Sequence, residues 1–259
     1  MKKTPKVETK NQPESSEKLQ KILAQAGMGS RREMETVIAD GQVRVNGNIA
    51  KLGDRVLPSD RISVGNRLLS RHQPTSRLRV LIYNKPDNQV CTRKDEEGRE
   101  TVFTHLPSLR NGRWIMVGRL DLNTSGLLLF TNNGELAYRL MHPKYAVERE
   151  YAVRIFGKVD EAMLRRLKKG VMLDDGEAKF DDIRLSGGSG LNVWYHVILH
   201  EGKNKEVRRL WESQGVTVSR LTRVRYGDLM LPPYLKPGRW DELENSNLTS
   251  LLKKVDLEQ

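Results

Sequence analysis

One acidic residue stands out in this sequence because of its neighbours. Asp121 lies in a polar segment, residues 118–126, between two apolar runs at 114–117 and 127–130. The Gly, Asn, Thr and Ser residues of this segment favour a turn, in which Asp121 would simply accept backbone hydrogen bonds. The alternative is that two strands hold a carboxylate at the end of a sheet, where it could act as a nucleophile or a base. A carboxylate in that position needs a cationic partner to stay ionised.

Other common catalytic and metal-binding patterns are absent from the sequence. It has no Walker A loop, no dinucleotide-binding glycine motif, no H-E-x-x-H and no G-x-S-x-G. The five His residues are scattered, and His196 and His200 do not converge on a metal if they share a strand. Cys91 is the only cysteine, which excludes a disulfide framework. We read it as a buried strand residue, and we expect no metal and no cofactor.

The chain carries a large excess of positive charge. Its 259 residues include 45 Lys and Arg against 33 Asp and Glu, a formal net charge of +12. Residues 1–80 hold 16 of these cations and 8 of the acids, so most of the excess lies in the first third. Lys and Arg gain affinity for nucleic acid by neutralising phosphates. Nucleic acid is therefore the expected partner, with a general contribution to solubility as the alternative.

The sequence also indicates where the protein works. No apolar run approaches the roughly 18 residues of a membrane span, and the longest clean run is residues 127–130. The first residues lack the apolar core of a secretory signal. We expect a soluble, cytoplasmic protein with no membrane partner, and nothing in the sequence requires more than a monomer.

The N-terminal third predicts a small α/β unit. Residues 1–16 are polar and indicate a disordered basic tail, and residues 19–26 have the apolar spacing of a helix. Ser30 to Glu33 forms a capping box that begins a second helix, followed by a short strand at 42–47. Arg31 and Arg32 would oppose the dipole of that helix, so an anionic ligand there would offset the cost.

The rest of the chain predicts an α+β domain. Residues 70–78 are expected to be a linker, residues 79–245 a second domain, and residues 246–259 a C-terminal helix or tail. Strands and helices intermix without regular β-α alternation, which favours α+β over a doubly wound sheet. The elements expected around Asp121 are strands near 80–85, 114–117, 127–130, 151–155, 192–200 and 218–226, and helices at 160–170 and 205–214.

The first unit resembles a known RNA-binding domain. The pattern K-x-x-x-x-x-G-x-x-S-R-R, followed by I-x-x-G-x-V-x-V-N-G, is similar to the S4 domain, and the resemblance covers residues 17–69. It implies that four cations face structured RNA: Lys18, Arg31, Arg32 and Arg44. An ordinary charged helix face is the alternative for these residues.

The second unit resembles an enzyme family. The motif G-R-L-D-x-x-T-S-G-L-L-L-F-T-x-x-G at 118–134 is similar to the catalytic loop of RNA pseudouridine synthases. The resemblance continues through L-M-H-P at 140–143, E-R-E-Y-A-V at 148–153 and E-G-K-N-K-E-V-R-R-L at 201–210. It is strongest to the RsuA/RluB group, in which an S4 domain precedes a catalytic domain with a mixed, mostly antiparallel sheet flanked by helices. Within that group the large-subunit type is the most similar.

The resemblance implies a role for each matching residue. Asp121 would be the catalytic aspartate, Tyr151 would stack on the target base, and Arg208 would pair with the catalytic carboxylate. Val207 would lie against the other face of the base. Four further residues would bind substrate: Arg119, Arg149, Lys203 and Asn204. Many relatives have Lys where this chain has Arg149, so a role that requires lysine is in doubt.

The implied function is isomerisation of one uridine to pseudouridine in 23S ribosomal RNA, at a hairpin near the peptidyl-transferase centre. The uridine would be flipped out of the RNA, and no cofactor or metal would be needed. Two alternatives remain open, a 16S enzyme of the same family and a non-catalytic ribosome-assembly factor. The sequence also leaves open whether Asp121 attacks the sugar, attacks the base or removes the 2′ proton.

Overall fold

The computed structural model describes residues 16–69, 77–109 and 112–258. Contacts divide the chain into two compact units, the first comprising Met1–Arg77 with Leu109–Arg113 and the second comprising Leu78–Ser108 with Trp114–Gln259. The expected tail (1–16) and linker (70–78) lie almost entirely outside the described residues. None of the helices in the described part of the chain is long and apolar enough to cross a membrane.

The first unit contains two helices and short strands, as its sequence predicts. Its elements are β1 (Glu17–Lys18), α1 (Leu19–Gln25), α2 (Arg31–Ala39), β2 (Val43–Val45), β3 (Asn48–Ile49), β4 (Arg55–Val56), β5 (Ile62–Val64) and β6 (Arg67–Leu68). A four-stranded sheet has the order β3-β2-β5-β6, and β1 pairs with β4. Strand β4 is confined to Arg55–Val56, because residues 51–54 form a turn.

Local signals in the first unit are confirmed. Ser30 Oγ accepts a hydrogen bond from Glu33 N at 3.1 Å, and the Glu33 carboxylate accepts one from Ser30 N, which completes the capping box at the start of α2. Asn46 and Gly47 both have positive φ, as a tight turn between paired strands requires. The buried core joins both helices to the sheet through Leu19, Leu23, Met34, Ile38, Val43 and Ile62.

The second unit is built on a large mixed sheet. Its path is β13-β14-β10-β15-β9-β7-β17, with β16 beside β15 and β8 beside β9. These strands are β7 (Val80–Lys85), β8 (Ile115–Val117), β9 (Ser125–Thr131), β10 (Arg149–Phe156), β13 (Asp182–Ser189), β14 (Asn192–Leu199), β15 (Thr217–Tyr226), β16 (Leu229–Met230) and β17 (Trp240–Glu242). All the pairings are antiparallel except β9 with β15. The predicted α+β class and mostly antiparallel sheet are confirmed.

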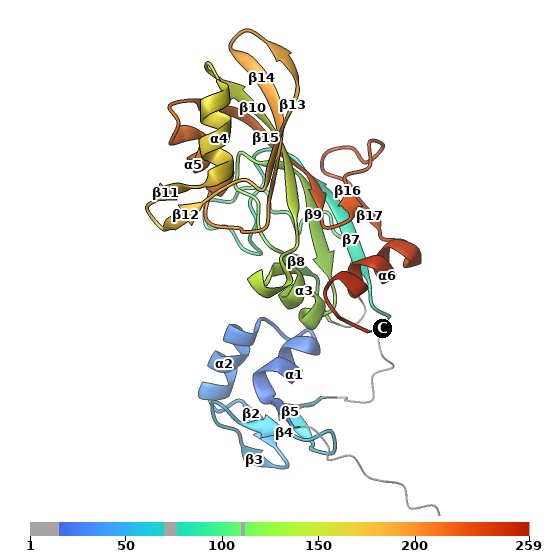
Figure 1. Cartoon of the computed structure of the whole chain (residues 1–259). Coiled ribbons are helices and arrows are strands. Elements are labelled where there is room, and N and C mark those ends of the chain that lie inside the picture. Colours follow the sequence, from blue (N-terminus) through green and yellow to red (C-terminus); the bar gives the residue numbers. More distant parts are fainter. Residues whose placement is uncertain (1–15, 70–76, 110–111, 259) are drawn as a thin grey trace, which may run out of the picture. The chain divides into compact units, whose positions relative to one another are not determined.

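Helices cover this sheet in two groups (Figure 1). The helices are α3 (Gly134–Met141), the 3-10 turn η1 (Pro143–Tyr145), α4 (Glu161–Lys169), α5 (Glu206–Glu212) and α6 (Asn245–Lys254), and a small hairpin joins β11 (Val171–Leu173) to β12 (Gly176–Ala178). One core joins α4 and α5 to β10, β14 and β15, and a second joins α3 and α6 to β7 and β9. The C-terminal helix is thus part of a core, because Leu248, Leu251, Leu252 and Val255 are buried in it.

One short contact joins the two halves of the large sheet. Strands β9 and β15 pair only at Ser125 with Thr222 and at Gly126 with Arg223. Gly126 has φ +100°, and a Cβ on it would lie 2.3 Å from the carbonyl oxygen of Arg223. Glycine is therefore required at this point for the backbones to approach.

Replacing Gly126 by Ala should destabilise the protein far more than the same change in an open turn. Gly176 is the matched control, because its φ is +110° but no atom lies within 4 Å of an added Cβ. A strained φ costs about 1–3 kcal/mol at either position, and Gly126→Ala adds the clash. Urea denaturation measures both variants, and equal losses of unfolding free energy would show that the close approach is unimportant.

Candidate active site

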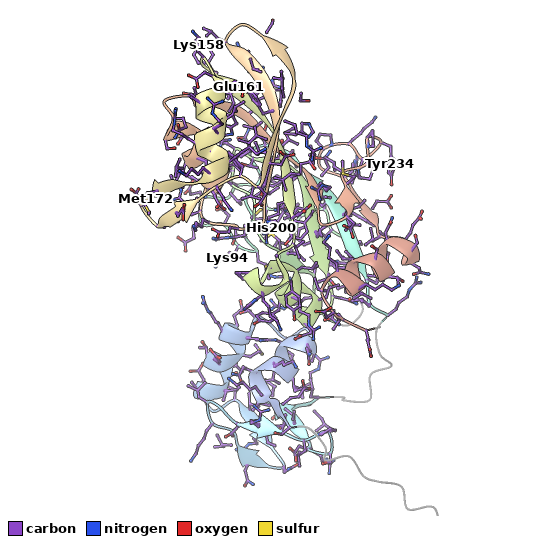
Figure 2. All side chains as sticks on the ribbon, viewed as in Figure 1. Lys94, Lys158, Glu161, Met172, His200 and Tyr234 are labelled. Atoms are coloured by element: carbon purple, nitrogen blue, oxygen red, sulfur yellow. The ribbon has the colours of Figure 1, made fainter. Side chains whose placement is uncertain are left out.

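A cleft of about 1060 Å³ lies beside the short contact between β9 and β15. The sequence analysis assigned eight residues to catalysis or substrate binding. Seven of these eight line the cleft: Arg119, Asp121, Arg149, Tyr151, Lys203, Asn204 and Val207. They come from the loop before β9, from β10 and from the segment leading into α5. Figure 2 labels His200, which follows the end of β14 and also lines the cleft. The fold therefore brings together residues that are 88 positions apart in the chain (119 and 207).

The Asp121 loop is held from behind by a buried lysine. Lys85 is fully buried, and its Nζ donates to the carbonyl oxygens of Pro86 at 3.0 Å, Leu122 at 3.2 Å and Thr124 at 2.9 Å. Burial lowers the pKa of Lys85, while the nearby charges of Cys91, Asp87 and Asp121 act in the opposite direction. Three carbonyl acceptors satisfy all three ammonium donors, so the loop is fixed by charge-assisted hydrogen bonds.

The Asp121 carboxylate itself is left free. Thr124 N donates to the Asp121 carbonyl at 3.0 Å, which closes the turn, but the side chain bonds to no other described residue. It is partly exposed and faces the cleft. Of the two interpretations from sequence, the geometry fits a carboxylate available to a ligand better than a carboxylate used to satisfy its own turn.

Arg208 does not form the ion pair that the resemblance implies. Its Nη1 donates to the carbonyl of Val218 at 3.0 Å and its Nη2 to that of Asn123 at 2.7 Å. It lines a separate, smaller pocket rather than the cleft. The expected pairing with Asp121 is therefore corrected for this structure. Arg208 supports the same loop through a main-chain carbonyl two residues further on, because its side chain lies on the other side of the loop.

A different arginine lies in the cleft. Arg223 of β15 is only 2% exposed, and its Nε donates to the carbonyl of Leu127 at 2.7 Å. The guanidinium lies over the Tyr226 ring, 5.0 Å from its centroid, and the buried Nη2 has no hydrogen-bond partner among the described residues. Arg223 thus places a buried positive charge with an unused donor in the wall of the cleft.

Tyr151 and Val207 give the cleft its apolar surfaces. Tyr151 lies on the central strand β10, opposite Val197 on one side and Arg223 on the other. The register with β15 shifts between Glu150 and Tyr151, a local irregularity that alters the direction of the strand next to the cleft. Val207 is 5% exposed on α5. An aromatic ring and an aliphatic side chain suit a flat, apolar ligand face.

The other predicted substrate-binding residues differ in whether their side chains are already held by contacts within the protein. Arg149 donates to the carbonyls of His200 and Glu201 and lies over the Tyr226 ring, so it fixes the turn after β14. Lys203 pairs with Glu201 at 2.9 Å. Arg119 and Asn204 are exposed at the rim. Only these two can reach a ligand without first breaking a protein contact.

Sequence reasoning missed several residues that line the cleft. Cys91, Glu206, Leu221 and Arg223 are among them, and Lys85 was missed behind the loop. Lys85 had a usable signal, because it is a cation at the end of a mainly apolar strand, directly before a proline. Cys91 follows an isolated bridge at Val90 and is partly exposed, so its predicted place in a strand is wrong. Burial raises the pKa of its thiol, which argues against a thiolate.

The four cations of the first unit that were predicted to face RNA are all exposed: Lys18, Arg31, Arg32 and Arg44. Arg44 donates to the carbonyl of Gly47 at 2.9 Å, and the four form no ion pair with a carboxylate among the described residues. They remain available for an anionic partner. No group of three or more metal-ligating side chains occurs in the part of the chain that the structure describes.

Comparison with known proteins agrees with this architecture. A family model described as RNA pseudouridylate synthase matches residues 79–213, and an S4 domain model matches residues 17–62. A solved structure titled "Crystal structure of pseudouridylate synthase" is 26% identical, with a TM-score of 0.62 over 90% of this chain and 99% of that chain.

Curated relatives are much more similar in sequence. The protein named "Ribosomal large subunit pseudouridine synthase B" from Escherichia coli is 58% identical over 245 residues, covering 93% of this chain and 84% of that protein. The protein of the same name from Haemophilus influenzae is 56% identical over 257 residues, covering 98% of this chain and 72% of that protein. With both domain models matched in order, the chain belongs to the RNA pseudouridylate synthase family and is an RNA pseudouridine synthase preceded by an S4 domain.

Proposed function

We propose that this protein converts one uridine of 23S ribosomal RNA to pseudouridine, with Asp121 as the catalytic residue. The observation that carries the proposal is the unpartnered Asp121 carboxylate, fixed from behind by Lys85 in a cleft walled by Tyr151 and Val207. The choice of large-subunit RNA follows from the names of the relatives that are 56–58% identical.

The reaction is a redox-neutral isomerisation. The N1–C1′ bond breaks, the uracil ring turns within the cleft, and a C5–C1′ bond forms while C5 loses a proton and N1 gains one. Asp121 starts the reaction by one of three routes: attack on the sugar, attack on the base, or removal of the 2′ proton. All three require a carboxylate that can approach the nucleotide, and Asp121 lines the cleft without a hydrogen bond to another described side chain.

Entry of the uridine into the cleft costs a few kcal/mol, because the base must leave the RNA stack. Stacking on Tyr151 offsets part of this, since a base on an aromatic ring gains about 1–3 kcal/mol. Val207 closes the opposite side of the ring. The spare Nη2 donor of Arg223 is suited to the developing negative charge on a uracil carbonyl or on the carboxylate.

Asp121→Asn should abolish pseudouridine formation and leave RNA binding intact. The amide cannot serve as nucleophile or base, so we expect the single-turnover rate on 23S RNA to fall at least about 1,000-fold. Asp174→Asn, the same change on an exposed turn, is the control and should keep the wild-type rate. Mapping pseudouridine after incubation with each variant gives the measurement, and normal activity of Asp121→Asn would rule out its catalytic role.

Lys85→Met should slow the reaction because it loosens the loop that carries Asp121. Three carbonyl groups lose their donor, so the loop shifts and the rate at saturating RNA should fall about 10–100-fold. RNA affinity should stay within about twofold of wild type, because Lys85 is buried and meets no substrate. Lys158→Met on the surface is the control. A wild-type rate for Lys85→Met, assayed well below its melting temperature, would show that the loop does not depend on this lysine.

The exposed cations of the S4 domain should contribute only to the affinity of the protein for RNA. Replacing Arg31 and Arg32 together by Gln should weaken RNA binding and lower the slope of log Kd against log salt by about 0.9 for each phosphate that is no longer neutralised. Folding should not suffer, since cations at a helix N-terminus are unfavourable. Lys51→Gln with Arg67→Gln removes two exposed cations elsewhere in the same unit. If both double variants weaken RNA binding equally, Arg31 and Arg32 contribute only through the net charge of the unit.

A further inference from the structure

The sheet of the second unit has a second, polar face. Side chains of β10, β13, β14 and β15 alternate, and one set fills the core under α4 and α5. The other set contains Trp194, His196, Arg184, Arg154 and Arg220, which are exposed or half exposed. We call the surface formed by this second set the open face. It lies opposite the face on which Tyr151 and Leu221 contribute to the cleft.

Three neighbouring strands place a row of matched side chains on the open face. Arg154 of β10 lies directly opposite Trp194 of β14 on one side and Arg220 of β15 on the other. Directly opposed residues have Cβ atoms about 4.5–5.5 Å apart, so the two guanidinium groups and the indole form one continuous strip. Arg154 is steadied by a hydrogen bond from its Nε to Ser219 Oγ at 2.9 Å.

A pocket of about 500 Å³ lies at the end of this strip. Trp194 and Arg220 line it together with Arg208, and Asn123 and Ser125 of the Asp121 loop form its other wall. Asp121 is two residues from Asn123, which corresponds to at most about 7 Å of chain. The cleft and this pocket therefore lie on the two sides of one loop.

The charges around the pocket are not balanced. On the open face, Arg225 is paired with Glu148 and Glu150, and Arg184 is paired with Asp182. In contrast, Arg154, Arg208 and Arg220 form no ion pair with any carboxylate of the described residues. Asp87 is the single acidic residue of the pocket wall.

We propose that this pocket and the strip Trp194–Arg154–Arg220 bind a second nucleotide of the RNA substrate, one that flanks the target uridine. Its base stacks on Trp194, and the adjoining phosphates meet Arg220 and Arg154. An aromatic ring beside uncompensated arginines is the pattern that binds single-stranded nucleic acid without reading its sequence. The inference rests on the proposed function, because it takes the RNA strand in the cleft as the same strand that continues past the loop.

Binding and rate measurements on the full chain test this subsite, with a 23S RNA fragment that the wild-type protein binds. Arg220→Gln is the decisive variant, because the Arg220 side chain is exposed and has no hydrogen bond or ion pair with another described residue, so the change removes no such contact within the protein. We expect it to weaken binding about threefold to tenfold and to lower the salt slope by about 0.7. The rate at saturating RNA should remain within about twofold of wild type.

Trp194 supplies an independent readout. Trp194→Ala should weaken binding about tenfold with an unchanged salt slope, and Trp194→Phe should restore most of the affinity because a ring is retained. Arg165→Gln and Lys158→Gln are exposed controls that line neither pocket, and they should bind like wild type. Lys158 is labelled in Figure 2.

Wild-type affinity and salt slope for Arg220→Gln would overturn the subsite, as would equal losses in the Arg165 and Lys158 controls. Either result would mean that the open face contacts a protein partner or solvent and not the RNA. Failure of the proposed function looks different, because wild-type protein would then bind the fragment but form no pseudouridine in it.

Discussion

The short parallel contact between β9 and β15 is the constraint on which the rest of the second unit depends. Two pairs of residues join the halves of the sheet, and beyond them the strands diverge. Gly126 allows the close approach, and Lys85 fixes the loop that leaves the same point. Because the strands separate here, a cleft forms on one face and a smaller pocket on the other. The Asp121 loop lies between them.

The site works by a division of roles among its charges. Lys85 and Arg208 donate to main-chain carbonyls, so they position the loop without forming a direct ion pair with Asp121. Arg223 adds a buried positive charge in the cleft wall and keeps one donor unused. We expect the exposed cations of the S4 domain to contribute attraction that does not depend on RNA sequence.

Much of this protein could be predicted from the order of its residues. Helix α2, with its capping box at Ser30, and the alternating strands β10 and β15 follow from local patterns that the fold does not override. The Asp121 loop was identifiable because a polar turn between two apolar runs is an unusual local pattern. Short elements such as β11, β12 and β17 were not predicted, because two or three residues carry too little periodicity.

The sequence by itself determined the family and the α+β class and singled out Asp121 as the candidate carboxylate, since these depend on motifs within one stretch of chain. Only the tertiary structure decided which cations stand beside that carboxylate. Arg208 and Arg223 are both basic residues in amphipathic elements, and nothing in their local patterns says which one enters the cleft. Strand register decided it: Arg223 pairs with Gly126, 97 residues earlier, and faces the cleft, whereas Arg208 reaches the far side of the loop. Such long-range placement depends on packing, which periodicity along the chain does not record.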